Sequence, residues 1–345
     1  FRRATPPIFE RIVVSEAVRA GAIEFVRIRG LDAVFLFGLM SLRGFFNGLE
    51  RNRILVVSTA VLASTNVVLN YGLIFGRLGM PKMGLAGAAW ASVVAQIAAF
   101  AVLFVYVFGR GHHRDYRLFR FKAWARGYFR KSVFAEMLNI SAPVALQHVF
   151  SVASFFLFVK LIETRGESAL AASEVAKNLY IMLMISTWGF ATAAGTFVGR
   201  LAGQNRPEDV WPTVRRVATT SAVVGCVLGA AVVLLPDVFL RIYTDQTEIV
   251  AIARDLCPLF ASAVALYSLG GVFLYAVVAA GAAKIGMYIE IVITAVYCAY
   301  MLAAHAADVS LPVFWFTEPI YFSCMAILSW AYLKSGRWKA YWKSQ

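Results

Sequence analysis

The chain has 345 residues, of which 60% are hydrophobic and 15% are charged, and its mean hydropathy is +0.70. Soluble domains carry about 25% charged residues, so this composition excludes an ordinary soluble domain and indicates a membrane protein. The net charge of +14 does not indicate nucleic-acid binding, because the Lys and Arg residues lie in short connectors between apolar runs. Basic residues in such connectors anchor a polytopic protein to the cytoplasmic face of its membrane.

Long apolar runs recur along the whole chain, and each is about as long as the 20 residues that a spanning helix needs. None alternates in the manner of a lipid-facing strand, so the sequence predicts an all-α polytopic membrane protein. About nine spans are expected, over residues 24–42, 54–75, 84–109, 138–162, 175–199, 213–235, 250–280, 285–306 and 312–333.

The basic residues are distributed unequally between the two sets of connectors. One set carries 20 of the 33 Lys and Arg residues and includes the stretch 110–131 and the tail 334–343, whereas the alternate connectors carry seven. Cytoplasmic connectors are the basic ones. The sequence therefore predicts a cytoplasmic C-terminus. The six basic residues within 1–29 then fall on the external side, against this rule.

The longest polar stretch divides the predicted spans unequally. We expect a partial N-terminal lobe of three helices over 1–109, a basic cytoplasmic linker over 110–135, and a C-terminal lobe of six helices over 136–345. Many transporters are built from two repeats with equal helix counts. The imbalance predicts that the first lobe lacks its first three helices.

Several motifs carry a family resemblance. "RGFFNGLERNR" is followed by "NVVLNYGLIFGRLGMPKMGLAGAAWASVVAQ", and later by "ALAASEVAKNL" and "AAGTFVGRLAGQ". In their order the first two resemble the multidrug and toxic compound extrusion (MATE) family, and the last two resemble the start and end of that family's eighth helix. The resemblance covers essentially the whole chain, aligned to the family's fourth through twelfth helices.

The resemblance implies a two-lobe fold of six plus six helices that works as a secondary active antiporter. Such proteins export cationic or amphipathic small molecules in exchange for H+ or Na+ by alternating access. The implied setting is the bacterial inner (cytoplasmic) membrane, with membrane lipids and a small-molecule substrate as partners, a monomeric chain and no cofactor or metal. The alternative is a flippase for lipid-linked saccharides from the same superfamily, which would carry a basic cavity.

Polar residues at membrane depth are costly and are candidates for function. In the first half, Asp32 is a candidate for ion coupling, and pairing with Arg29 or Arg27 is the structural alternative. Asn66 and Asn70 are four residues apart and share a helix face, where they either line a cavity or bond a neighbouring helix.

In the second half, Gln147 and Ser151 share one helix face, as do Glu174 and Asn178. The resemblance aligns the coupling carboxylates of Na+-dependent members with Ser151 and Gly270, so neither carboxylate is present here. We therefore expect Glu174, Asn178 and Ser151 to meet a coupling cation.

Local ion pairing is the alternative for Glu174, because Lys177 lies one helical turn away. Glu290 and Glu318 are further acidic residues in spans, each with a cavity-facing or a capping role open to it. The chain shows no nucleotide loop, zinc-type spacing or nucleophile–base pairing, so we do not expect an enzyme.

Overall fold

The computed structural model describes residues 16–49, 51–109 and 131–343. Helices and turns make up these ranges, which contain no strand, so the predicted all-α class is confirmed. Contacts within the chain define two units, residues 1–128 and 129–345, and each is described by itself. Most of the predicted basic linker lies outside the described residues. The helix after it begins at Lys131 rather than at the predicted boundary of 136.

The first unit consists of helices joined by short turns. In chain order these are α2 (Glu16–Arg29), the 3-10 turn η1 (Gly30–Asp32), α3 (Ala33–Gly48), α4 (Asn52–Phe75) and α5 (Gly84–Gly109). Small residues on α5 let α4 and α5 pack closely. A Cβ added at Gly87 would lie 2.6 Å from the carbonyl oxygen of Leu73 on α4, which accounts for the glycine of the "GLAGAAW" motif.

The span expected over 24–42 is not one helix. It is divided between α2 and α3 by η1, where Gly30 lowers the helix propensity and Asp32 is turned toward Arg29. The backbone stays right-handed through the break, with φ −86° and ψ −3° at Asp32. The hydrophobic pattern predicted the apolar run correctly but not the break inside it.

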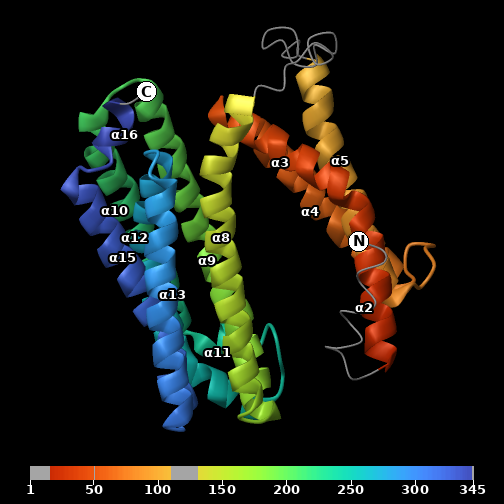
Figure 1. Cartoon of the computed structure of the whole chain (residues 1–345). Helices are drawn as coiled ribbons and strands as arrows, with labels where there is room; N and C mark the ends of the chain where they lie inside the picture. Colours follow the sequence, from red (N-terminus) through yellow and green to blue (C-terminus); the bar gives the residue numbers. More distant parts are fainter. Residues whose placement is uncertain (1–15, 50, 110–130, 344–345) are drawn as a thin grey trace. The chain divides into compact units, whose positions relative to one another are not determined.

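The second unit contains the longest described helices, α8, α9 and α12 (Figure 1). In chain order its elements are α8 (Lys131–Glu163), α9 (Glu167–Gly203), η2 (Pro207–Asp209), α10 (Val210–Leu234), α11 (Pro236–Leu240), α12 (Thr247–Ala279), α13 (Ala283–Ala306), α14 (Leu311–Trp315), α15 (Thr317–Ser335) and α16 (Lys339–Lys343). Helix α12 is the most buried of them and packs against α9, α10 and α15.

Eight helical segments among the described residues are long and apolar enough to cross a membrane. Two of them, α4 and α5, belong to the first unit, and the other six belong to the second unit. Many large apolar side chains on these helices are exposed, as expected of a surface that faces lipid. The protein is therefore a multi-pass membrane protein.

An aromatic cluster fixes the start of α15. The Trp315 ring contacts Phe158 of α8 and Phe260 of α12, with ring centroids 4.5 and 4.8 Å away. Its indole nitrogen donates a 3.1 Å hydrogen bond to the Ser173 hydroxyl of α9. Because this side chain is held by three helices, the residues just after it enter α15 in a defined position.

Candidate functional site

The second unit has an open cavity of about 770 Å³ between α8, α9, α12, α13 and α15. These helices pack against one another within the unit (Figure 1). The wall is mainly apolar and aromatic, with a few polar groups, as is usual for small-molecule sites. Its polar and aromatic members include Gln147, His148, Ser151, Tyr180, Trp188, Tyr267, Tyr275, Glu290, Tyr297, Glu318, Tyr321 and Phe322.

Two buried carboxylates line this cavity, and each accepts hydrogen bonds from tyrosine hydroxyls. Tyr180 of α9 donates to Glu318 over 3.1 Å, and Tyr297 of α13 donates to its other oxygen over 3.3 Å. Tyr321 of α15 donates to Glu290 of α13. Glu290 is 2% exposed and Glu318 is 8% exposed. Charged groups are buried in this way only when their hydrogen-bonding needs are met.

The helix period brings these groups together. On α13, Glu290 and Tyr297 are seven residues apart and lie on the buried face. On α15, Glu318 and Tyr321 are one turn apart, and Glu318 lies in the first turn, where the helix dipole favours a negative charge. Each helix therefore presents one carboxylate and one phenol to the other.

Helix α8 adds Gln147 and Ser151, the two polar side chains that were predicted to share one helix face. Gln147 and Ser151 lie one helical turn apart on α8, in the same lining as Glu290 and Tyr321. Both residues line the cavity. Three helices thus contribute polar side chains to the part of the lining that contains Glu290.

Comparison with solved structures shows a shared fold. A multidrug resistance MATE family transporter of the MOP superfamily, in its outward-facing conformation, superposes with a TM-score of 0.87 at 16% identity, covering 100% of this chain and 75% of that chain. The eukaryotic MATE transporter AtDTX14 gives a TM-score of 0.81 at 20% identity, covering 99% and 75%.

Comparison with sequences points the same way. A probable multidrug resistance protein NorM of Thermotoga maritima is 23% identical over 69% of this chain and 50% of its own length. The NorM protein of Aromatoleum aromaticum is 29% identical over 54% and 39%. The MatE family model matches residues 143–304. Over this part of its length the chain is similar to the MATE family. It spans about half the length of the curated relatives that it matches.

The MATE resemblance aligned a carboxylate with Gly270, and the structure shows why this position is small. Gly270 lies on α12 against α15, where an added Cβ would be 3.1 Å from the Ala326 nitrogen and 3.2 Å from the Phe322 carbonyl oxygen. A carboxylate side chain does not fit in this contact. Glu318 of α15 lines the cavity.

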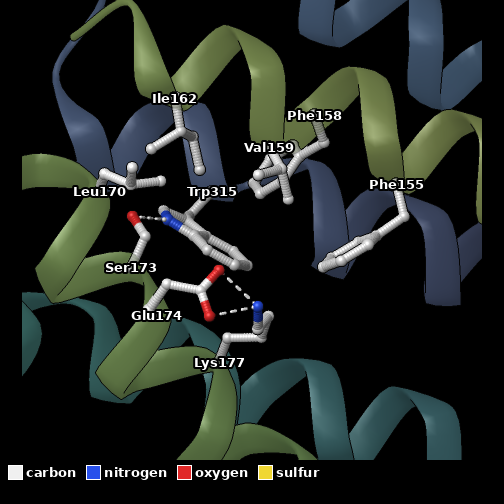
Figure 2. A pocket seen from close by; sticks show the side chains of 9 residues that line it. All are labelled: Phe155, Phe158, Val159, Ile162, Leu170, Ser173, Glu174, Lys177 and Trp315. Atoms are coloured by element: carbon white, nitrogen blue, oxygen red, sulfur yellow. Dashed lines mark hydrogen bonds and ion pairs between the residues drawn. The ribbon is translucent and has the colours of Figure 1, made fainter. Parts of the chain in front are cut away.

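The structure does not bring Glu174, Asn178 and Ser151 together. Glu174 lines a separate hollow of about 10 Å³, room for about one water molecule. Both of its carboxylate oxygens lie 2.5 Å from the Lys177 ammonium (Figure 2). Asn178 is exposed and does not line the cavity that Ser151 lines. Glu174 is therefore paired locally with Lys177 in this structure.

The polar candidates of the first unit are engaged in local contacts. Arg29 reaches Asp32 at 2.5 Å and Gln96 at 3.1 Å, and Asp32 is buried. Asn70 donates to Asn66 over 2.7 Å, and Asn66 donates to the Ser92 hydroxyl over 3.3 Å. Asn66 thus links α4 to α5, whereas Asn70 is bonded to Asn66 within α4.

The tyrosines at Glu318 and Glu290 were not expected from the sequence. Tyr180, Tyr297 and Tyr321 are ordinary members of apolar runs, and nothing in their spacing distinguishes them from membrane-facing aromatics. The signal that exists is the pairing of an acidic residue with a tyrosine on one face of a helix, which occurs on both α13 and α15.

Proposed function

We propose that this chain belongs to a secondary active antiporter that exports cationic or amphipathic small molecules in exchange for H+ or Na+. The observation that carries the proposal is the cavity of about 770 Å³, which combines an aromatic wall with two buried carboxylates. Aromatic faces attract organic cations, and carboxylates supply the opposite charge. The relatives' names, as multidrug resistance proteins and MATE transporters, support the same function.

The charge of the cavity argues against the flippase alternative. Its lining within the described residues contains two glutamates and a histidine, and no Lys or Arg. A lipid-linked saccharide carries phosphate, which a protein holds with basic side chains or backbone amides. An acidic cavity would repel such a headgroup.

The proposed setting is the bacterial cytoplasmic membrane, with the C-terminus inside. The basic residues of α15 and the tail, among them Lys334 and Arg337, support this orientation because positive residues are retained on the cytoplasmic side. In alternating access, the helices around the cavity would expose it to the two sides in turn. Lipids surround the chain, and it works as a monomer without a cofactor.

The proposal is tested in proteoliposomes that contain the full chain and a fluorescent cationic dye. Proton and sodium gradients are imposed separately, and dye movement is followed against an anionic dye of similar size. We expect gradient-driven movement of the cationic dye alone. Absence of movement under both gradients, or equal movement of both dyes, would overturn the proposal. Glu163→Gln is the matched control and should move the dye as the parent does, because Glu163 forms an exposed pair with Lys160 outside the cavity lining.

Binding is measured on the same preparations by quenching of tryptophan fluorescence. Trp188 lines the cavity and is 46% exposed, so a dye in the cavity would quench it. The quenching should decrease in Trp188→Phe. The control is Trp211→Phe, because Trp211 lies outside the cavity lining and packs against Phe273.

A further inference from the structure

At the cavity, helices α13 and α15 exchange hydrogen bonds between tyrosine hydroxyls and carboxylates. Helix α13 supplies Glu290 and Tyr297, helix α15 supplies Glu318 and Tyr321, and each tyrosine is hydrogen-bonded to the carboxylate of the other helix. The rings of Tyr297 and Tyr321 contact each other, with centroids 5.6 Å apart at an interplanar angle of 80°. The two carboxylates are thus joined through two touching phenols.

The surroundings of this exchange hold few other ionisable groups. Among the described residues of the lining, α8 contributes His148, α9 contributes Tyr180, and α12 contributes Tyr267 and Tyr275. No Lys or Arg side chain belongs to this lining. The charge of the two carboxylates is therefore not balanced by a permanent cation at the cavity, in contrast to the pair formed by Glu174 and Lys177.

The hydrogen-bond partners suit a proton at each carboxylate. An ionised carboxylate only accepts hydrogen bonds, whereas a protonated carboxyl donates one, and a phenol can do either. Tyr297 and Tyr180 at Glu318, and Tyr321 at Glu290, can therefore reverse their role when a proton arrives. Each carboxyl group can therefore keep at least one phenol partner whether it is protonated or ionised.

A sodium ion would need a different set of ligands. Oxygen-binding cations in transporters are commonly held by unwound backbone carbonyls together with side chains. Here Glu290 and Tyr297 lie in the continuous helix α13, whose carbonyls are used within the helix. The hydroxyls at the carboxylates are already donors to them.

We propose that Glu290 and Glu318, with their crossed tyrosines, form a paired proton-carrying site of this cavity, in place of Glu174. The inference rests on the proposed function for its role in coupling. Each carboxylate takes up one proton from the cavity and returns it there. A cationic substrate in the same cavity binds when the pair is ionised, so substrate binding and proton binding exclude one another.

Infrared difference spectroscopy of the full chain in nanodiscs, between acidic and alkaline pH, tests the site without any substrate. We expect bands of protonated carboxyl groups in the parent, with one band lost in Glu290→Gln and another lost in Glu318→Gln. Glu174→Gln should retain both bands. If neither glutamine variant changes the spectrum, the proposal is overturned.

A second pair of variants covers the case in which a glutamine variant does not fold. Tyr321→Phe and Tyr297→Phe retain the rings and remove one hydrogen bond each, so each should shift the frequency of one carboxyl band. If the carboxyl bands keep their frequencies in both phenylalanine variants, the proposed proton site is contradicted. Sodium chloride in place of choline chloride at constant pH should leave the bands unchanged, and their removal by sodium would overturn a proton site in favour of a sodium site.

Binding of tetraphenylphosphonium by calorimetry separates this inference from the proposed function. We expect the affinity to fall by about tenfold or more in Glu290→Gln and Glu318→Gln at alkaline pH, and to be unchanged in Glu174→Gln. A parent that shows both carboxyl bands but binds no probe would contradict the proposed function and leave the proton pair standing. A parent that binds the probe with equal affinity in all variants would overturn the pair.

Discussion

Tyr180 of α9 and Glu318 of α15 are joined by a hydrogen bond of 3.1 Å, although 138 positions separate them in the chain. Both residues are buried, and both line the cavity. The contact links a helix early in the second unit to its last spanning helix. The position of Glu318 therefore depends on the packing of the whole unit rather than on its own helix.

Replacing Tyr180 with phenylalanine tests this contact. Tyr180→Phe keeps the ring and leaves one oxygen of a buried carboxylate without its donor, which should lower the free energy of unfolding by about 1–3 kcal/mol. Thermal unfolding followed by circular dichroism in detergent measures the change. The control, Tyr288→Phe, alters a side chain that is 57% exposed and should have little effect. Equal stability of the two variants would show that the hydroxyl contributes nothing.

The contact between α12 and α15 is tested by adding a methyl group. In Gly270→Ala, the new Cβ would press on the Ala326 nitrogen and the Phe322 carbonyl oxygen, and overpacking of this kind costs about 1–3 kcal/mol. The matched control is Gly189→Ala in the interior of α9, where a Cβ meets nothing within 4 Å. That variant should be stabilised by about 0.5–1 kcal/mol, because alanine favours a helix over glycine. The same sign of change in both would contradict the packing described for Gly270.

For Glu174 we predict that substitution has little effect on stability or transport. Its partner Lys177 is 19% exposed and its own side chain is 44% exposed, so the loss of the pair in Glu174→Gln should cost no more than about 1 kcal/mol. Dye movement and its ion dependence should be unchanged, because Glu174 lies outside the large cavity. Loss of ion dependence in this variant alone would restore Glu174 as the coupling residue.

The orientation of the chain is tested with reporters fused after Gln345. If the C-terminus is cytoplasmic, a fused fluorescent protein should be fluorescent and a fused alkaline phosphatase should be inactive. As a second test, Lys334 and Arg337 can be replaced together by glutamine. Fewer basic residues should lower the fraction of chains with a cytoplasmic C-terminus, and so lower the reporter fluorescence. An active phosphatase on the parent chain would contradict the charge count.

The sequence predicted the class of the fold and the positions of most spans because these depend on apolar runs, which the chain itself displays. It also placed Gln147 and Ser151 on one helix face, since that follows from the helix period. The pairing of Asp32 with Arg29 was among the alternatives for the same reason. All of these features depend on residues close together in the chain.

The structure supplied what depends on distant neighbours. The run over 24–42 did not reveal the turn at Gly30–Asp32, because glycine is tolerated in many spanning helices. Glu318 precedes a proline at a helix start, so its sequence pattern is typical of a helix cap. Only the folded unit shows that tyrosines of α9 and α13 donate hydrogen bonds to Glu318. Glu174 is paired with Lys177, three residues away in the chain, and not with Ser151 of α8.

The central claim is that Glu290 and Glu318 exchange protons for a cationic substrate in one cavity. Its most direct test is the number of protons released when tetraphenylphosphonium binds to the full chain, measured with a pH dye in weakly buffered solution at a pH where both carboxyl bands are present. We predict release by the parent and by Glu174→Gln, and none by the double variant Glu290→Gln, Glu318→Gln at saturating probe. Equal proton release by the parent and the double variant would contradict the account.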